Sequence, residues 1–159
     1  MKYGHATTAA TACFLVSVLI ASTAIAQSSP TGLWKTFDDS TGKPTAIIRI
    51  SDDHGELKGE IEKLLAQPAD DNNPTCTRCT DRRKDQPIVG MTIIEGMHAD
   101  SSSADSKSFV GGSILDPDDG KMYKSRLLLS DDGKTLQVRG YIGVPLLGRT
   151  QTWQQVQSP

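Results

Sequence analysis

The fold is decided by the stretch GGSILDPDDGK, residues 111–121, together with the segments that follow it, MYKSRLLLS (122–130), DDGK (131–134) and TLQVRGY (135–141). Strand-like runs, rich in β-branched, aromatic and leucine residues, alternate here with Asp-Gly turns. Asp-Gly between such runs is a strong short-range signal for a β-hairpin. Successive hairpins build antiparallel sheet, so this part of the chain predicts an all-β protein.

The same pattern extends over most of the chain. Eight segments have strand character and are separated by turn residues. They are residues 33–37, 46–51, 56–64, 89–95, 108–115, 122–130, 135–142 and 150–156. Almost every connection is short enough for a hairpin, and closing such a sheet on itself removes its unpaired edges. We therefore predict one antiparallel up-and-down β-barrel of about eight strands.

The N-terminus has the features of a secretory signal peptide over residues 1–26. A weakly basic start precedes an apolar run from Ala12 to Ala21, and Ala24-Ile25-Ala26 fits a small-x-small cleavage site. Cleavage would leave residues 27–159 as a single domain and place it in the periplasm or outside the cell. The apolar run is about half the roughly 20 residues of a membrane-spanning helix, so we expect no stable membrane insertion.

The charge pattern argues against two classes of partner. The formal net charge is −2 at pH 7, and positive and negative residues are interspersed along the chain. This pattern gives no basic field for nucleic acid and no polybasic patch for anionic lipid, so neither partner is expected.

Alternation within the strands predicts which side chains point into the barrel. The residues expected to form the interior, as ligand lining or barrel closure, are Trp34, Ile48, Ile50, Leu57, Ile61, Tyr123, Ser125, Leu127, Leu129, Leu136, Val138, Ile142 and Trp153. An eight-stranded barrel is at the size where side chains either fill the interior or leave room for one small ligand. The sequence leaves both possibilities open.

The opposite faces of the same strands carry Arg126, Arg139 and Tyr141, which we expect on the outside. An alternative register, shifted by one residue, would bring Arg139 into the barrel. A buried arginine would then need a carboxylate partner or an anionic ligand.

One long connection, residues 66–87, interrupts the hairpins and contains Cys76 and Cys79. In an oxidising compartment two cysteines this close most often form a disulfide, which is our leading interpretation. A redox-active thiol, favoured by the nearby Arg78, and a zinc site are the alternatives. Neither spacing nor ligand count supports a metal, and no cofactor is predicted. No catalytic motif is present, and the paired aspartates fit turn chemistry, so the sequence favours a non-catalytic protein.

The chain resembles a family of exported bacterial proteins of unknown function, DUF2147. The resemblance rests on segments in matching order: Gly32-Leu33-Trp34, residues 84–90 (KDQPIVG), residues 111–117 (GGSILDP), residues 120–123 (GKMY), residues 138–143 (VRGYIG) and residues 147–153 (LGRTQTW). It implies a lipocalin-like barrel in the cell envelope and no established activity. Gly32-x-Trp34 is also similar to the lipocalin start motif, which implies that Trp34 closes the barrel beneath a basic side chain, for which Arg149 is the candidate.

Two functions follow as hypotheses. The first is the binding of a small, largely apolar molecule inside the barrel, without catalysis. The second is a structural or interaction role in the envelope, with a filled barrel and loops that contact another protein. A thiol or metal function of the Cys76 and Cys79 loop ranks third.

Overall fold

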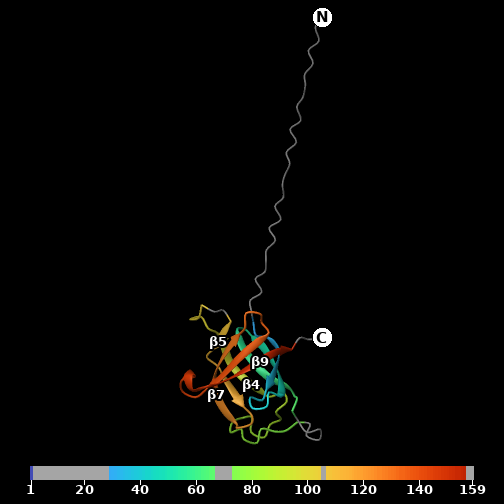
Figure 1. Cartoon of the computed structure of the whole chain (residues 1–159), viewed down its shortest axis with the longest axis vertical. Coiled ribbons are helices and arrows are strands. Elements are labelled where there is room, and N and C mark those ends of the chain that lie inside the picture. The colour runs from blue at the N-terminus through green and yellow to red at the C-terminus, as the bar shows by residue number, and fades with distance from the viewer. Residues whose placement is uncertain (2–28, 67–72, 105–106, 157–159) are drawn as a thin grey trace.

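The computed structural model describes residues 1, 29–66, 73–104 and 107–156, and these form an all-β fold (Figure 1). The predicted signal peptide and its cleavage site lie outside the described residues, apart from Met1. No helix within the described ranges is long and apolar enough to cross a membrane.

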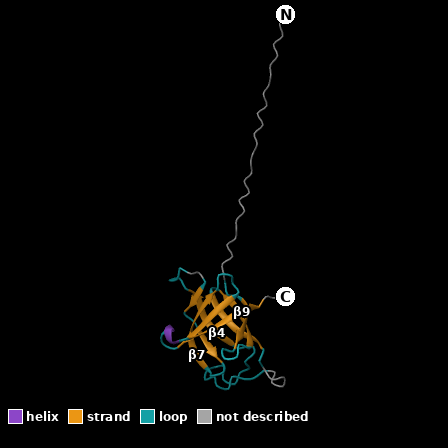
Figure 2. Cartoon of the chain, in the orientation of Figure 1, coloured by secondary structure: helices purple, strands orange, loops and turns teal. Residues whose placement is uncertain are grey.

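Nine β-strands and one short 3-10 turn make up the fold (Figure 2). The strands are β1 (Gly32–Phe37), β2 (Pro44–Asp53), β3 (Glu56–Leu64), β4 (Thr92–Ala99), β5 (Ser108–Val110), β6 (Ser113–Asp116), β7 (Lys121–Leu129), β8 (Thr135–Tyr141) and β9 (Arg149–Val156), and the 3-10 turn η1 is Pro145–Leu147. All strand pairs are antiparallel.

The sheet closes into a barrel. Apart from β5 and β6, each strand pairs with the next along the chain, and β1 pairs with β9, which joins the two ends of the sheet. Strands β5 and β6 both lie between β4 and β7, so together they occupy the position of one strand in the barrel. The result is a closed up-and-down barrel of eight strands, with β5 and β6 counted as one, which confirms the predicted fold class.

Glycine explains why the predicted strand 108–115 is divided into β5 and β6. At Gly112 the backbone approaches β4 so closely that a Cβ atom would lie 2.3 Å from the carbonyl oxygen of Glu95. Only glycine fits there, and Gly111 beside it has a positive φ of 89°. The chain bends at this pair and then resumes its pairing with β4 and β7.

The predicted strand 89–95 is shifted in the structure, where β4 runs from Thr92 to Ala99. Gly90 has a φ of 90°, and the amide of Met91 donates to the carbonyl of Ile88 at 3.1 Å. Residues 88–91 therefore form a turn that leads into the strand. The apolar residues before Thr92 suggested a strand, but the turn at Gly90 ends the extended conformation there.

The inward alternation is largely confirmed. Buried side chains gather inside the barrel, and those predicted for the interior include Trp34, Ile48, Ile50, Leu57, Ile61, Ser125, Leu127, Leu129, Leu136, Val138 and Trp153. The prediction for Ile142 is wrong, because β8 ends at Tyr141 and the side chain of Ile142 is 66% exposed. The described structure leaves one buried polar side-chain atom without a hydrogen bond, the hydroxyl oxygen of Ser125.

Candidate functional site

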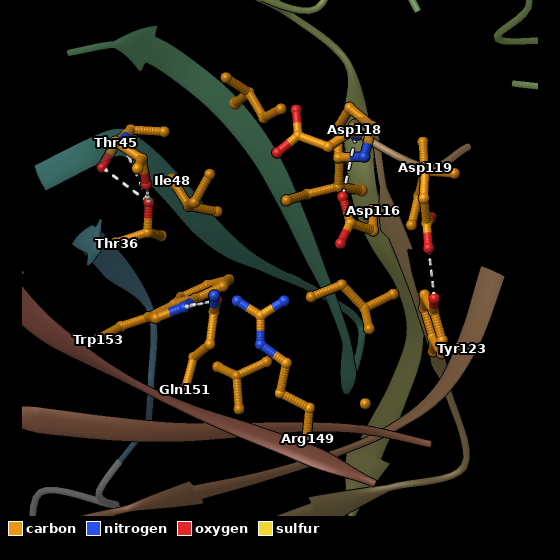
Figure 3. Close-up of a pocket in the computed structure, with 18 of the residues that line it drawn as sticks. Thr36, Thr45, Ile48, Asp116, Asp118, Asp119, Tyr123, Arg149, Gln151 and Trp153 are labelled. Carbon is orange, nitrogen blue, oxygen red and sulfur yellow. Dashed lines mark hydrogen bonds between the residues drawn. The ribbon is translucent and has the colours of Figure 1, made fainter. Parts of the chain in front are cut away.

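One end of the barrel contains a cavity of about 790 Å³ that is open to solvent (Figure 3). It is lined where β1, β6 and β8 end and where β2, β7 and β9 begin. Its apolar wall comprises Ile48, Ile61, Leu64, Ile88, Ile93, Ile114, Leu115, Val138 and Trp153. The interior is therefore not completely filled, and the open question of the sequence is answered in favour of a space for a ligand.

The other end of the barrel is filled with side chains. Leu57, Met97, Leu127 and Leu136 are almost fully buried there and do not line the cavity. These residues lie at the ends of their strands opposite the cavity. The barrel thus has a packed half, which we call the base, and a hollow half, which contains the cavity.

The predicted lining residues divide between these two halves. The cavity is lined by Ile48, Ile61, Tyr123, Val138, Arg149 and Trp153. Trp34, Ile50 and Leu127 lie in the filled half. Arg139 lies on the outer wall, where its guanidinium donates to the carbonyls of Pro145 (2.7 Å) and Leu146 (3.2 Å) and to the hydroxyl of Thr150 (2.6 Å). The register that would bring Arg139 inside is not the one observed.

The contact expected between Trp34 and Arg149 does not form. Trp34 pairs with Gln155 near the end of β9, whereas Arg149 begins the same strand and pairs with Gly140. A separation of six residues along a strand corresponds to roughly 20 Å. Trp34 instead donates from its indole nitrogen to the carbonyl of Pro30 at 2.7 Å, which joins the segment before β1 to the packed base.

Polar side chains line the cavity near the start of β2 and β9. The hydroxyls of Thr36 and Thr45 lie 2.6 Å apart, and Thr36 also accepts a hydrogen bond from the amide of Ala46 at 3.0 Å. On the neighbouring strand β9 the amide oxygen of Gln151 accepts a hydrogen bond from the indole of Trp153 at 3.2 Å (Figure 3). The apolar wall is therefore interrupted by groups that can bond to a polar atom of a ligand.

The β6–β7 turn places three carboxylates at the cavity, Asp116, Asp118 and Asp119. Burial raises the pKa of Asp116, and the charges of Asp118 and Asp119 act in the same direction. Tyr123 donates to Asp119 at 2.5 Å, and this bond raises the pKa of the phenol to about 12. The turn thus combines one carboxyl that resists ionisation with one that is held by a phenol.

Arg149 points toward the middle of the cavity in Figure 3 and is the only cation among the described residues that line it. Its guanidinium forms an ion pair with Asp39 in the β1–β2 loop. This bond and the charge of Asp39 raise the pKa of Arg149 against the opposing effect of partial burial. Asp38, beside it, has its pKa lowered to about 2 by hydrogen bonds from Ser40 and Thr41.

The loop that contains Cys76 and Cys79 lies at the hollow end of the barrel and is fixed there. The two cysteines are buried and form a disulfide, as predicted. Arg78 donates to the carbonyl of Asp118 at 2.9 Å. A Cβ atom on Gly120 would lie 2.0 Å from the carbonyl oxygen of Arg78, so only glycine permits this approach of turn and loop.

A buried arginine fixes the second half of this loop. Arg83 is 6% exposed, forms an ion pair with Asp81, and donates to the carbonyl of Thr92 in β4 at 3.0 Å. Its hydrogen bonds lower the pKa of Asp81 to about 2. The loop therefore has both a covalent and an electrostatic support.

Within the part of the chain that the structure describes, no group of three or more His, Cys, Asp or Glu side chains is placed to hold a metal ion. The disulfide leaves neither Cys76 nor Cys79 as a free thiolate.

Several residues at the cavity were not singled out from the sequence. They are Thr36, Thr45, Asp116 and Gln151. Strand alternation contained the signal for two of them, since Thr36 lies two residues after Trp34 and Gln151 two residues before Trp153. Nothing in the linear pattern shows that the β6–β7 turn, and Asp116 with it, faces the cavity.

Comparison with known proteins agrees with this fold. Protein HP1028 from the human pathogen Helicobacter pylori, described as belonging to the lipocalin family, has a similar structure, with a TM-score of 0.67. The likeness covers 81% of this chain and 84% of that one at 15% sequence identity, and it shows a lipocalin-like fold. None of the curated proteins matches the chain. Residues 32–155 match the model of a bacterial family described as "Uncharacterized protein conserved in bacteria", and the chain therefore belongs to that family, DUF2147.

Proposed function

We propose that the protein binds a small, largely apolar molecule in the hollow half of its barrel, without catalysing a reaction. The observation that carries this proposal is the cavity of about 790 Å³, whose wall combines apolar side chains with a few polar groups. Cavities that hold small organic ligands typically measure roughly 300–1,000 Å³ and combine apolar walls with a few polar groups. The threonine pair and Gln151 provide those groups here.

The charges at the cavity indicate the kind of polar end that such a ligand carries. Among the described residues, four carboxylates line it, Asp38, Asp116, Asp118 and Asp119, against the single cation Arg149. Arg149 is already paired with Asp39. An anionic group would be repelled by this ring, so the proposed ligand has an apolar body and a neutral or cationic polar end.

We place this function in the periplasm or outside the cell. Two observations support that location: the signal-peptide features of residues 1–26 and the Cys76–Cys79 disulfide, since disulfides persist mainly in oxidising compartments. The ligand-binding form would then be residues 27–159.

The direct test is a fluorescence titration of residues 27–159 with N-phenyl-1-naphthylamine, a neutral apolar probe whose emission rises in an apolar site. We expect saturable binding and quenching of tryptophan emission, because Trp153 lines the cavity. The substitution Ile114→Trp adds bulk to the cavity wall and should weaken probe binding about tenfold or more. Ile88→Trp, which narrows the same cavity from the loop, should act in the same direction.

The matched control is Leu128→Trp on the outer wall of β7, outside the cavity. It adds the same bulk and should leave probe affinity unchanged. Thermal unfolding of each variant shows that it is folded. Absence of saturable binding by the wild type, or equal affinity in the folded cavity variants, would refute the proposal.

A further inference from the structure

A cluster of exposed apolar side chains stands on the loop between β8 and β9. Ile142 is 66% exposed, Val144 55%, Leu146 86% and Leu147 80%. These are four of the most exposed large apolar residues in the described structure, and they lie within six consecutive positions. We call residues 142–147 the apolar tip.

The apolar tip projects from the side of the barrel, as Figure 2 shows for the 3-10 turn within it. Arg139 faces outward from β8 and donates to the carbonyls of Pro145 and Leu146. At the base of the tip, a Cβ on Gly148 would lie 2.5 Å from the carbonyl oxygen of Gly140. These contacts hold the loop against the outer wall. Val144 and Leu146 face solvent away from the cavity, whereas Ile142 and Leu147 are exposed beside the cavity that they also line.

The wall beneath the tip has a one-sided charge. The strands β7, β8 and β9 and the loop 142–148 contain no Asp or Glu. On the outer face, Arg126 pairs with Arg139 across the strands, and Lys124 pairs with Tyr141. Along the chain these charges looked dispersed, and strand pairing brings them together.

Few carboxylates neutralise this wall. Arg126 contacts Asp100 at 3.0 Å, whereas Arg139 is bonded to backbone carbonyls and a hydroxyl, which leave its charge uncompensated. Among the described residues, Lys124 contacts no carboxylate. The wall therefore carries net positive charge next to the apolar tip.

We propose that the apolar tip and the basic wall of β7–β9 together dock the protein on a membrane surface that contains anionic lipid. Exposed apolar side chains beside cations are the combination that binds the interface of a bilayer, where the former enter the headgroup region and the latter approach lipid phosphates. Tyr141, whose ring suits the same interface, lies between them.

A protein partner fits this surface less well than a lipid interface. Stable protein interfaces take about 20–30 residues from each side, and the tip is a single short loop on a charged wall. The carboxylates of the cavity rim lie on the β1–β2 loop and the β6–β7 turn, not on this wall. The protein would therefore lie with its β7–β9 side toward the membrane.

The test is co-sedimentation of residues 27–159 with phosphatidylcholine vesicles, with and without phosphatidylglycerol. We expect binding that is stronger with phosphatidylglycerol and weakens as salt is added. The double variant Val144→Ser/Leu146→Ser should lower the partition coefficient about tenfold or more. Lys124→Gln should lower it about fivefold, and only when phosphatidylglycerol is present.

Two controls match these changes in chemistry but not in place. Leu65→Ser removes an exposed leucine that follows β3, away from the tip and the basic wall, and Lys63→Gln removes a cation from β3. Both should bind vesicles like the wild type. Because Val144 and Leu146 do not line the cavity, the double variant should also keep its affinity for N-phenyl-1-naphthylamine.

Several outcomes would overturn the proposal. These are no binding to either vesicle, equal loss in the control variants, or self-association in gel filtration that depends on Leu146 while vesicle binding is absent. Vesicle binding is measured without a cavity ligand, so its failure is distinguishable from failure of the ligand-binding function.

Discussion

The two halves of the barrel are built from the same eight strand positions, yet one half is packed and the other is hollow. In the base, Leu57, Met97 and Leu127 fill the space between the walls. In the hollow half, the inward-facing side chains of the same strands surround a cavity, and loops and turns complete its wall. The packed half mainly stabilises the fold, whereas the hollow half provides the proposed binding site. Substitutions in the two halves should therefore have separable effects on stability and on binding.

The largest effect is expected from a matched pair on β2. Ile50→Ala in the packed base should destabilise the protein by about 2–5 kcal/mol, because a buried isoleucine leaves a void among close neighbours. Ile48→Ala, on the cavity wall, should cost about half as much, since one side of that residue already faces open space. Urea unfolding of both variants measures the difference. Equal losses would mean that the hollow half is as tightly packed as the base.

The next effect concerns the covalent support of the hollow half. Replacing both cysteines, Cys76→Ser/Cys79→Ser, should lower the free energy of unfolding by about 2 kcal/mol, since closing so short a ring restricts the unfolded chain only modestly. We expect the loss in thermal unfolding to be accompanied by weaker probe binding. Weakened stability with unchanged probe affinity would show that the cysteine loop does not shape the cavity.

The electrostatic support of the same loop predicts a pH dependence. The pKa of Asp81 is about 2 in the folded protein against 3.8 for the free carboxyl, so its pairing with Arg83 stabilises the protein above about pH 4 and is lost as the pH falls toward 2. Asp38, whose pKa is also about 2, adds to the loss of stability in acid.

The variant Asp81→Asn isolates the contribution of Asp81. Its melting temperature should lie below that of the wild type at pH 7, and the difference should shrink as the pH approaches 2. A difference that stays constant over this range would assign the effect to packing of the side chain, and not to its charge.

The smallest effect is expected at the cavity rim. Tyr123→Phe removes the hydrogen bond to Asp119 and should cost about 1 kcal/mol in chemical unfolding. Because the ring itself remains, the cavity should keep its shape and its affinity for an apolar probe. A large loss of affinity would instead mark the phenol as a direct ligand contact.

Much of the fold could be predicted because local signals agree with it. Asp-Gly turns and period-two alternation specify hairpins, and they located seven of the eight predicted strands closely. For example, the predicted strand 56–64 matches β3 residue for residue. The failures have local causes as well. The turn at Gly90 shifts the start of β4 to Thr92. The close approach of the Gly112 backbone to β4 divides the predicted strand 108–115 into β5 and β6.

The candidate site was less predictable, because it depends on which ends of the strands meet. Alternation identified Ile48, Ile61 and Val138 as inward but could not assign them to the hollow half, nor Ile50 and Leu127 to the base. The lipocalin resemblance predicts Arg149 directly above Trp34, and the register of β9 shows that it lies at the other end of the strand. The basic wall of β7–β9 was also hidden, since it arises across strands and not along them.

The fixed position of the cysteine loop bears on how fast a ligand can enter and leave. The loop is tied to the β6–β7 turn at Gly120 and Arg78 and to β4 through Arg83, so it is poorly suited to swing aside. The β8–β9 loop, which contributes Ile142 and Leu147 to the cavity, is held by hydrogen bonds from Arg139 to the carbonyls of Pro145 and Leu146, and its apolar side chains are largely exposed. We therefore expect the exchange rate of a ligand to follow the motion of the β8–β9 loop, which would place the route of exchange on the side where the protein meets a membrane.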